Sequence, residues 1–271
     1  MKKFTAKEYI DKYENNDIHH WDDVTEVTVK DIGCSRYKVI TYTGEKSKIK
    51  LSTFTIKQYK GKYVLHGLYT TKYDDKSIKF KGYFRYGNLH RDGDKPAVRR
   101  WHENGTRRAI MYFKENEVYR DAGIAFQEWY PNGKLRWEFH QLNGEFHRVG
   151  DAAIRLWNEA GLLIVEEWAI KGTCHRRNAA AFRLWNDNGV LIKEKWYFNG
   201  KRHRLDDAYC RKRNDNGVLI KEKWAINDKL HREGDAAIRQ WNDEGKLIKE
   251  EWWEYGKKHK NVLTKVAKIE A

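Results

Sequence analysis

The sequence has little of what marks several common classes of protein. It contains 2 prolines and 3 cysteines in 271 residues. Scarce proline excludes a proline-rich linker or a collagen-like chain, and widely spaced cysteines give neither a disulfide framework nor a zinc-ligand spacing. No run approaches the ~20 apolar residues that a membrane-spanning helix needs. The N-terminus lacks the apolar segment of a signal peptide, so we expect an intracellular, cytoplasmic chain that is neither secreted nor transmembrane.

The sequence also lacks the motifs that carry most catalytic chemistry. It has no phosphate-binding glycine loop, no nucleophile elbow and no pair of catalytic carboxylates. Its Asp-Asn-Gly turns lack the bidentate glutamate of a calcium loop, and the cluster His19-His20 with Asp22-Asp23 lies in a connection between elements. We therefore expect a protein that is not an enzyme, with no catalytic residue, metal, cofactor or small-molecule substrate.

Positive charge and aromatic residues are abundant. The chain has 54 Lys and Arg against 39 Asp and Glu, which gives a formal net charge of +15. Aromatic residues make up 14% of the sequence, which argues against disorder, and 12 of them are tryptophans.

A repeat of 28 residues accounts for most of the tryptophans. A His-Arg pair recurs at this interval from His147 to His231, and a glycine recurs from Gly105 to Gly245 without exception. Two aromatic columns keep the same period. Their tryptophans are Trp101, Trp129, Trp157, Trp185 and Trp241 in one column and Trp168, Trp196, Trp224 and Trp252 in the other. A fixed period of this length is typical of a repeat architecture.

Each repeat is predicted to be a β-hairpin. Residues 153–157 and 162–170 have the alternation of strands, and the turn between them starts at Asn158 and ends at Gly161. A second turn leads to the next His-Arg pair. The sequence therefore predicts an all-β fold: an elongated, single twisted antiparallel sheet of tandem hairpin repeats, with an atypical N-terminal cap.

Alternation along the strands predicts two different faces. If Trp157 opposes Leu162 across the turn, one face carries Arg155, Glu166 and the two tryptophan columns, and it changes little between repeats. We predict that this face is the packing spine, in which Arg155 and Glu166 attract each other. The opposite face varies and is rich in lysine, so it is predicted to meet solvent or a partner. Its candidate binding residues are Lys193, Lys195, Lys221, Lys223 and Lys249.

The ends of the chain depart from the repeat, as the ends of solenoids do. We predict an N-terminal cap at 1–60, which starts with a short helix after Thr5, then the repeat array at 61–260 and a basic tail at 261–271. Strands outside the regular repeats are expected at 24–30, 37–43, 49–59, 62–70 and 77–86. The repeat at 209–213 lacks both the alanine and the tryptophan of its neighbours, so we expect it to be the weakest link.

The segment from Trp185 to Arg204, with Asn199-Gly200-Lys201 and His203-Arg204, resembles the MORN repeat variant. It is similar to the form written NG…EWYxNGKxHRxDGPA, which is abundant in giant DNA viruses and occurs in phages and bacteria. The stretch 90–97 matches its HRxDGPA part, whereas 150–153 reads Gly-Asp-Ala-Ala. The resemblance covers about 85–260. It implies a sheet that acts as a scaffold for protein or lipid contacts, and a viral protein such as a virion or minor capsid component.

The His-Arg pairs allow more than one interpretation. Histidines of successive repeats should lie roughly 10 Å apart, too far to share a metal ion, so we expect them to structure turns. The arginine that follows each is either a solvated edge charge or part of a basic stripe along one rim. These candidate rim residues are Arg148, Arg176, Arg204 and Arg232. Cys174 and Cys210 replace apolar residues and are expected to be buried.

These patterns predict a non-enzymatic repeat scaffold that docks through its basic face onto an acidic protein surface in a larger, for example viral, assembly. The main alternative is a basic, non-specific nucleic-acid-binding protein. An anionic lipid surface is a further candidate partner. A third hypothesis, an antitoxin- or immunity-like partner binder, follows from bacterial relatives of the repeat.

Overall fold

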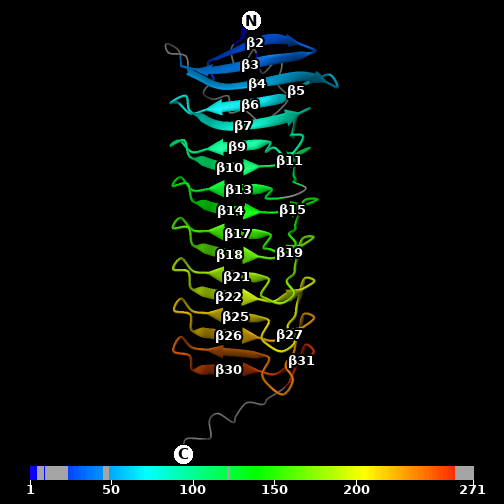
Figure 1. The fold of residues 1–271 in the computed structure, drawn as a ribbon, viewed down its shortest axis with the longest axis vertical. Coiled ribbons are helices and arrows are strands. Elements are labelled where there is room, and N and C mark those ends of the chain that lie inside the picture. The colour runs from blue at the N-terminus through cyan, green and yellow to red at the C-terminus, as the bar shows by residue number, and fades with distance from the viewer. Residues whose placement is uncertain (5–8, 10–23, 45–48, 121–122, 260–271) are drawn as a thin grey trace, which may run out of the picture. The chain divides into compact units, whose positions relative to one another are not determined.

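The computed structural model describes residues 1–4, 9, 24–44, 49–120 and 123–259. All elements with defined bounds are β-strands (Figure 1), and their antiparallel hairpins confirm the predicted fold class. No described element is a helix with the length and apolar character needed to cross a membrane. The chain divides into two compact parts, Met1–Leu135 and Arg136–Ala271, which we call the N-terminal and C-terminal parts. The helix predicted after Thr5, except Tyr9, and the tail predicted at 261–271 lie outside the described residues.

The N-terminal part is built on one antiparallel series of long strands. Its strands are β1 (Lys2–Phe4), β2 (Glu26–Gly33), β3 (Arg36–Thr43), β4 (Ile49–Tyr59), β5 (Lys62–Leu65), β6 (Gly67–Lys72), β7 (Ile78–Arg85), β8 (Asn88–Leu89), β9 (Val98–Trp101), β10 (Arg107–Met111), β11 (Phe113–Lys114), β12 (Glu117–Val118) and β13 (Phe126–Trp129). The long strands pair in the order β1, β2, β3, β4, β6, β7, β9, β10 and β13.

The sequence predicted β2, β3, β4 and β7 with nearly the observed bounds, but it did not predict β1. The strand predicted at 62–70 is divided into β5 and β6, because Gly67 has a φ of 89° and redirects the chain after His66. A glycine accepts this positive φ because it has no Cβ to clash with the backbone. Both pieces still pair with β4.

The apolar core of the N-terminal part lies on one face of β2–β7. Val27, Val39 and Phe54 are almost completely buried there. Tyr9 packs edge-on against Phe54, with 6.4 Å between the ring centroids. The burial pattern of β4 alternates along the strand, as expected when one face of a sheet is covered and the other is open.

The C-terminal part repeats one hairpin motif. Its strands are β14 (Leu135–Phe139), β15 (Gln141–Leu142), β16 (Glu145–Phe146), β17 (Ile154–Trp157), β18 (Leu163–Glu167), β19 (Ala169–Ile170), β20 (Thr173–Cys174), β21 (Phe182–Trp185), β22 (Leu191–Lys195), β23 (Tyr197–Phe198), β24 (Lys201–Arg202), β25 (Cys210–Arg213), β26 (Leu219–Lys223), β27 (Ala225–Ile226), β28 (Lys229–Leu230), β29 (Ile238–Trp241), β30 (Leu247–Glu251), β31 (Trp253–Glu254) and β32 (Lys257–Lys258). Each repeat has a main hairpin, such as β17–β18, and a minor two-stranded hairpin, such as β19–β20, at one edge (Figure 1).

The register of the main hairpin corrects one prediction. Arg155 lies directly opposite Glu166, as expected, but Trp157 opposes Leu163 and not Leu162. A bulge beside Trp157 shifts the register, because Leu162 closes the turn: its carbonyl accepts the N–H of Asn158, and its N–H donates to the Asn158 side chain.

Alanine, and not tryptophan, occupies the most buried positions of the repeats. Ala153, Ala181 and Ala237 have no exposed surface, whereas every tryptophan of the two columns is only half-buried. Every residue of β17, β18 and β21 is half-buried as well, so both faces of this sheet are partly open. A large ring on such a sheet packs mainly against neighbours in its own layer. The predicted spine is therefore less buried than expected.

Candidate docking face of the C-terminal part

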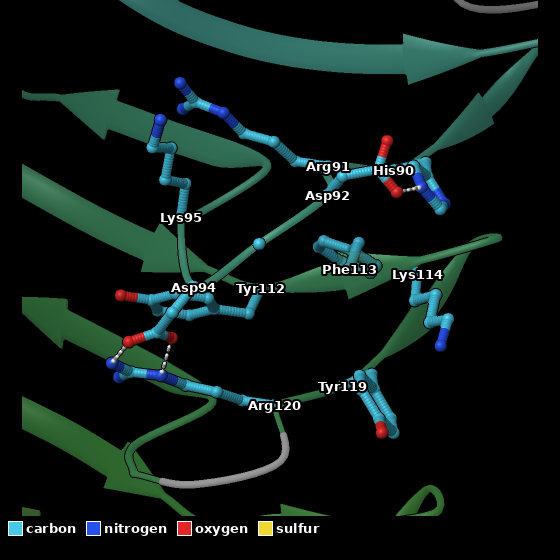
Figure 2. A pocket seen from close by; sticks show the side chains of 11 residues that line it. His90, Arg91, Asp92, Asp94, Lys95, Tyr112, Phe113, Lys114, Tyr119 and Arg120 are labelled. Atoms are coloured by element: carbon cyan, nitrogen blue, oxygen red, sulfur yellow. Dashed lines mark hydrogen bonds and ion pairs between the residues drawn. The ribbon is translucent and has the colours of Figure 1, made fainter.

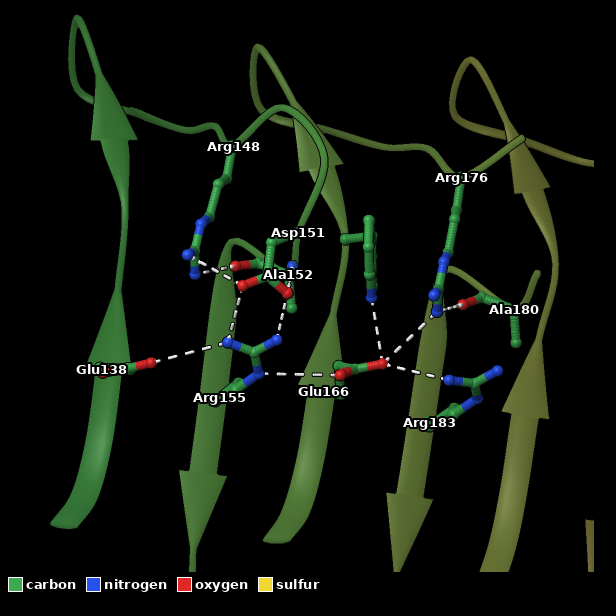
Figure 3. A network of polar contacts seen from close by, with 10 residues as sticks. Glu138, Arg148, Asp151, Ala152, Arg155, Glu166, Arg176, Ala180 and Arg183 are labelled. Carbon is green, nitrogen blue, oxygen red and sulfur yellow. Dashed lines mark hydrogen bonds and ion pairs between the residues drawn. The ribbon is translucent and has the colours of Figure 1, made fainter. Parts of the chain in front are cut away.

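One face of the C-terminal part carries a row of alternating charges (Figure 3), which we call the charge ladder. Each member lies opposite the next across neighbouring strands. The members are Glu138, Arg155, Glu166, Arg183, Glu194, Arg211, Glu222, Arg239 and Glu250. The sequence predicted the pairs within each repeat but not their continuation from one repeat to the next, which requires the register between hairpins.

The contacts around Glu166 show how the ladder is held together. Its carboxylate lies 3.7 Å from Arg155 Nε, 3.2 Å from Arg183 Nη1 and 3.5 Å from Arg176 Nη1, and its side chain is 12% exposed. Trp168 Nε1 also donates to it at 3.0 Å. Charges with so many partners at low exposure are neutralised within the fold and are not available to a ligand.

The four candidate rim arginines have structural partners as well. Arg176 lies 3.6 Å from the ring centroid of Trp168 and donates to the carbonyl of Ala180. Arg148, Arg204 and Arg232 make the same kind of bond to an alanine carbonyl, and each pairs with an aspartate three residues later. These side chains are only 20–30% exposed, so the prediction of solvated edge charges is wrong. Arg176, Arg204 and Arg232 cover Trp168, Trp196 and Trp224 through cation–π contacts.

The recurring histidines link one repeat to the next. The Nδ1 atoms of His147, His175 and His203 accept the backbone N–H of a residue 24 positions later, at 3.1–3.3 Å. That residue is the first of two consecutive positive-φ residues in the turn of the next minor hairpin, for example Asn199 at 48° and Gly200 at 76°. Such a turn leaves its own N–H groups unpaired, and the preceding repeat supplies the acceptors. The sequence predicted a role in turns but not this bond between repeats.

The lysines gather on the opposite face of the same strands. Lys193 on β22 opposes Lys212 on β25, and Lys212 opposes Lys221 on β26. Lys195 and Lys223 lie in the neighbouring row of the same face, where each is opposite Cys210. We call these five lysines the lysine face. Like charges directly opposite each other are unfavourable, and in the described part of the chain none of the five lies within ion-pair distance of a carboxylate.

Other residues modify the lysine face at its edges. Lys249, also predicted for this face, is paired with Glu251 at 2.6 Å, and the lysine–glutamate contact lowers the pKa of Glu251 to about 2. Burial, with the charges of Lys223 and Lys249, lowers the pKa of Lys221. Lys212 was missed in the sequence because its repeat departs from the pattern; the equivalent residue of other repeats is Leu156, Leu184 or Gln240.

Apolar residues continue the lysine face toward the start of the C-terminal part. On β17, β18 and β21 the row of Lys193 carries Leu156, Val165 and Leu184, which lie opposite one another. On the same strands the adjacent row carries Ile154, Glu167 and Phe182 before it reaches Lys195, whose ammonium lies 5.6 Å from the centre of the Phe182 ring. All of these apolar side chains are half-exposed. One sheet face therefore presents an apolar half, which also holds the carboxylate of Glu167, beside a basic half.

The described residues include cavities but no metal site. A cavity of about 400 Å³ in the N-terminal part is lined by residues 90–95 and 112–114 together with Tyr119 and Arg120 (Figure 2). Its two carboxylates are already paired: Arg120 donates to both carboxylate oxygens of Asp94 at 2.7 and 2.9 Å, and His90 Nε2 lies 2.9 Å from Asp92. Among residues with described positions, no three His, Cys, Asp or Glu side chains are placed to hold a metal ion.

Comparisons with known proteins add no further identification. No family model matches the chain, no curated protein is similar to it, and no solved structure matches its fold.

Proposed function

We propose that this protein is a non-enzymatic repeat scaffold that docks onto an acidic protein surface through the lysine face. The observation that carries the proposal is the direct opposition of Lys193, Lys212 and Lys221 across neighbouring strands. Opposed like charges cost roughly 0.2–1 kcal/mol per pair, and carboxylates of a bound partner would remove this cost. The charge ladder on the other face does not require the carboxylates of a partner, because its own charges neutralise one another.

The apolar half of the same face favours a protein over a nucleic acid. Leu156, Val165 and Leu184 would gain about 25 cal/mol per Å² of apolar surface when a protein covers them, whereas a phosphate backbone offers no apolar surface. Single-stranded nucleic acids also need open aromatic rings for stacking. The faces of Trp168, Trp196 and Trp224 are covered by arginines at 3.6–4.0 Å. A nucleic-acid-binding protein therefore remains an alternative outcome of the test.

The wider setting of the proposal rests on the repeat resemblance and the net charge. A rigid, basic array suits a component of a larger assembly such as a viral particle, and an acidic shell protein would be a suitable partner. Cofractionation of the endogenous protein with particles or complexes would support this setting. A protein found only as free chain would contradict it.

The test measures binding of the full chain to fluorescent poly-glutamate, duplex DNA and single-stranded DNA by anisotropy over a range of salt concentrations. The charge-reversal variant is Lys193→Glu with Lys221→Glu. Its matched control is Lys201→Glu with Lys229→Glu, which makes the same change of charge at exposed positions on minor hairpins. Circular dichroism checks that each variant is folded.

We expect poly-glutamate to bind the wild type and the control variant but not the charge-reversal variant. Tighter binding of DNA than of poly-glutamate, with a steep fall as salt increases, would replace the acidic protein by a nucleic acid. If the charge-reversal variant bound poly-glutamate and DNA as well as the control variant does, the lysine face would not be the docking site.

A further inference from the structure

The repeats of the C-terminal part are joined by a recurring backbone bond. The N–H groups of Trp168, Trp196 and Trp224 each donate to a carbonyl at the start of the next main hairpin, at 2.7–2.8 Å. Trp252 holds the same position in the last repeat. None of the described residues accepts its N–H, and none of them forms a further main hairpin after it.

The series of histidine bonds between repeats also stops at the last described repeat. His231 Nδ1 accepts the N–H of Tyr255, which belongs to the last minor hairpin. His259 is the next histidine in the series, and its ring is 51% exposed with Nε2 3.3 Å from Glu254. No backbone N–H among the described residues reaches its Nδ1.

One edge of β30, the last long strand, is also unpaired among the described residues. β30 pairs with β29 on one side and with no described strand on the other. Ile248 is 63% exposed there. The charge ladder also ends on this strand: Arg239 Nε lies 2.8 Å from Glu250, and the next position, where inner repeats place an arginine, is empty in the described part. An open strand edge of this kind is a template for another strand.

We infer that the open edge of β30 binds an extended segment of a partner protein, with alternating apolar residues around an arginine. Earlier in the array, Glu166, Glu194 and Glu222 hold the position of Glu250, and each pairs with the first strand of the next main hairpin. That strand begins with an apolar residue or Cys210 followed by an arginine, as in Ile238-Arg239. A partner strand of this pattern would bring its arginine to Glu250 and its carbonyl to the Trp252 N–H. Main-chain bonds would give affinity, and the arginine would fix the register.

A second copy of this chain is a poorer occupant of the edge. The strands that have the required pattern are already paired on both sides; β17, for example, lies between β14 and β18. β1 at the other end of the described strands reads Lys-Lys-Phe and has no arginine. The geometry therefore points to a different protein, and self-association becomes an outcome of the test.

The experiment adds a peptide with the sequence of residues 151–158, Asp-Ala-Ala-Ile-Arg-Leu-Trp-Asn, to the ¹⁵N-labelled full chain. We expect shifts and slower hydrogen exchange of the Glu250 and Trp252 amides, because both N–H groups gain acceptors. A peptide with glutamate in place of its arginine should bind at least roughly tenfold more weakly, which corresponds to about 1.4 kcal/mol. The chain variant Glu250→Gln should also weaken binding, and Glu244→Gln, in an exposed turn, should not.

Several results would overturn the inference. Absence of shifts at Glu250 and Trp252 would do so, as would shifts centred on Lys212 and Lys221 or equal binding of both peptides. Concentration-dependent association of the free chain, abolished by Glu250→Gln, would assign the edge to a second copy. The Lys193→Glu, Lys221→Glu variant should bind the peptide normally, so failure of the lysine-face proposal is distinguishable from failure of this one.

Discussion

The guanidinium of Arg204 lies 4.0 Å from the centre of the Trp196 ring and pairs with Asp207 at 2.7 Å. Its Nη1 also donates to the carbonyl of Ala208, which has no exposed surface. One arginine thus fixes the loop after the His-Arg pair both to the aromatic column and to the buried Ala208. This arrangement explains why the His-Arg pair, the tryptophan and the alanine keep a common period.

Removal of the Trp196 ring should destabilise the C-terminal part. We expect Trp196→Ala to lower the free energy of unfolding by about 3 kcal/mol, the lower end for a large aromatic side chain because the ring is half-buried. Urea unfolding followed by far-UV circular dichroism measures the change. Trp196→Phe keeps a ring under Arg204 and should cost less. An unchanged midpoint for Trp196→Ala would contradict the packing role of the column.

The charge ladder should be sensitive to loss of a single carboxylate. Glu194 lies opposite Arg183 and Arg211 and also 2.9 Å from Arg213, with its side chain 11% exposed. Glu194→Gln removes the carboxylate that pairs with Arg213 and one of the carboxylates that face Arg183 and Arg211, so we expect a loss of roughly 3 kcal/mol in the same urea assay. Glu233→Gln, at an exposed site, should change little. Equal effects of the two variants would show that the ladder contributes no specific stability.

The sequence predicted the fold better than the site, for a physical reason. The 28-residue period, the strand alternation and the turn residues are local signals, and they gave the hairpins and the Arg155–Glu166 pair correctly. The ladder, the histidine bonds and the Lys193–Lys212 contact depend on how one hairpin aligns with the next. The bulge beside Trp157 also changes the register by one residue without a clear sequence signal. Lys212 was overlooked because its repeat breaks the pattern from which the faces were assigned.

The stability of the N-terminal part should fall when His66 is protonated. Burial lowers the pKa of His66 below its usual value, and the charges of Lys57, Arg36 and Arg85 lower it further. Its Nδ1 also accepts the N–H of Tyr86 at 3.4 Å, which requires the neutral ring. The unfolded chain then binds more protons than the folded chain, so stability rises with pH and its His66 contribution is complete above about pH 6.5.

That contribution is lost as the pH falls through the lowered pKa of the folded state. Urea midpoints measured between pH 7.5 and pH 5 should therefore decline, and the decline should be smaller in His66→Asn. An NMR titration of the His66 ring gives its pKa directly. A value above the usual range, or the same decline in the variant, would refute the assignment.

The cysteine thiols should react in the order of their pKa values and exposure. Burial and the hydrogen bond to Glu167 at 2.8 Å raise the pKa of Cys174 to about 12. Burial also raises the pKa of Cys210, although the surrounding lysines oppose this effect. Cys34 is exposed. Since the thiolate is the reactive form, iodoacetamide at pH 8 should modify Cys34 first and Cys174 last, as followed by peptide mass spectrometry. Early modification of Cys174 would contradict the burial described.

Substitution of Lys212 should change the stability of the chain and its binding of poly-glutamate in opposite directions. Lys212→Gln removes the charge that faces Lys193 and Lys221, so the free chain should gain roughly 0.5 kcal/mol of stability. The same change removes a cation from the centre of the lysine face and should weaken poly-glutamate binding. Hydrogen exchange of β25 amides tests the related expectation that this repeat opens most easily, and the variant should slow that opening. A variant that lost stability would show that Lys212 has a stabilising partner. The repeat of Lys212 would then be no less stable than its neighbours.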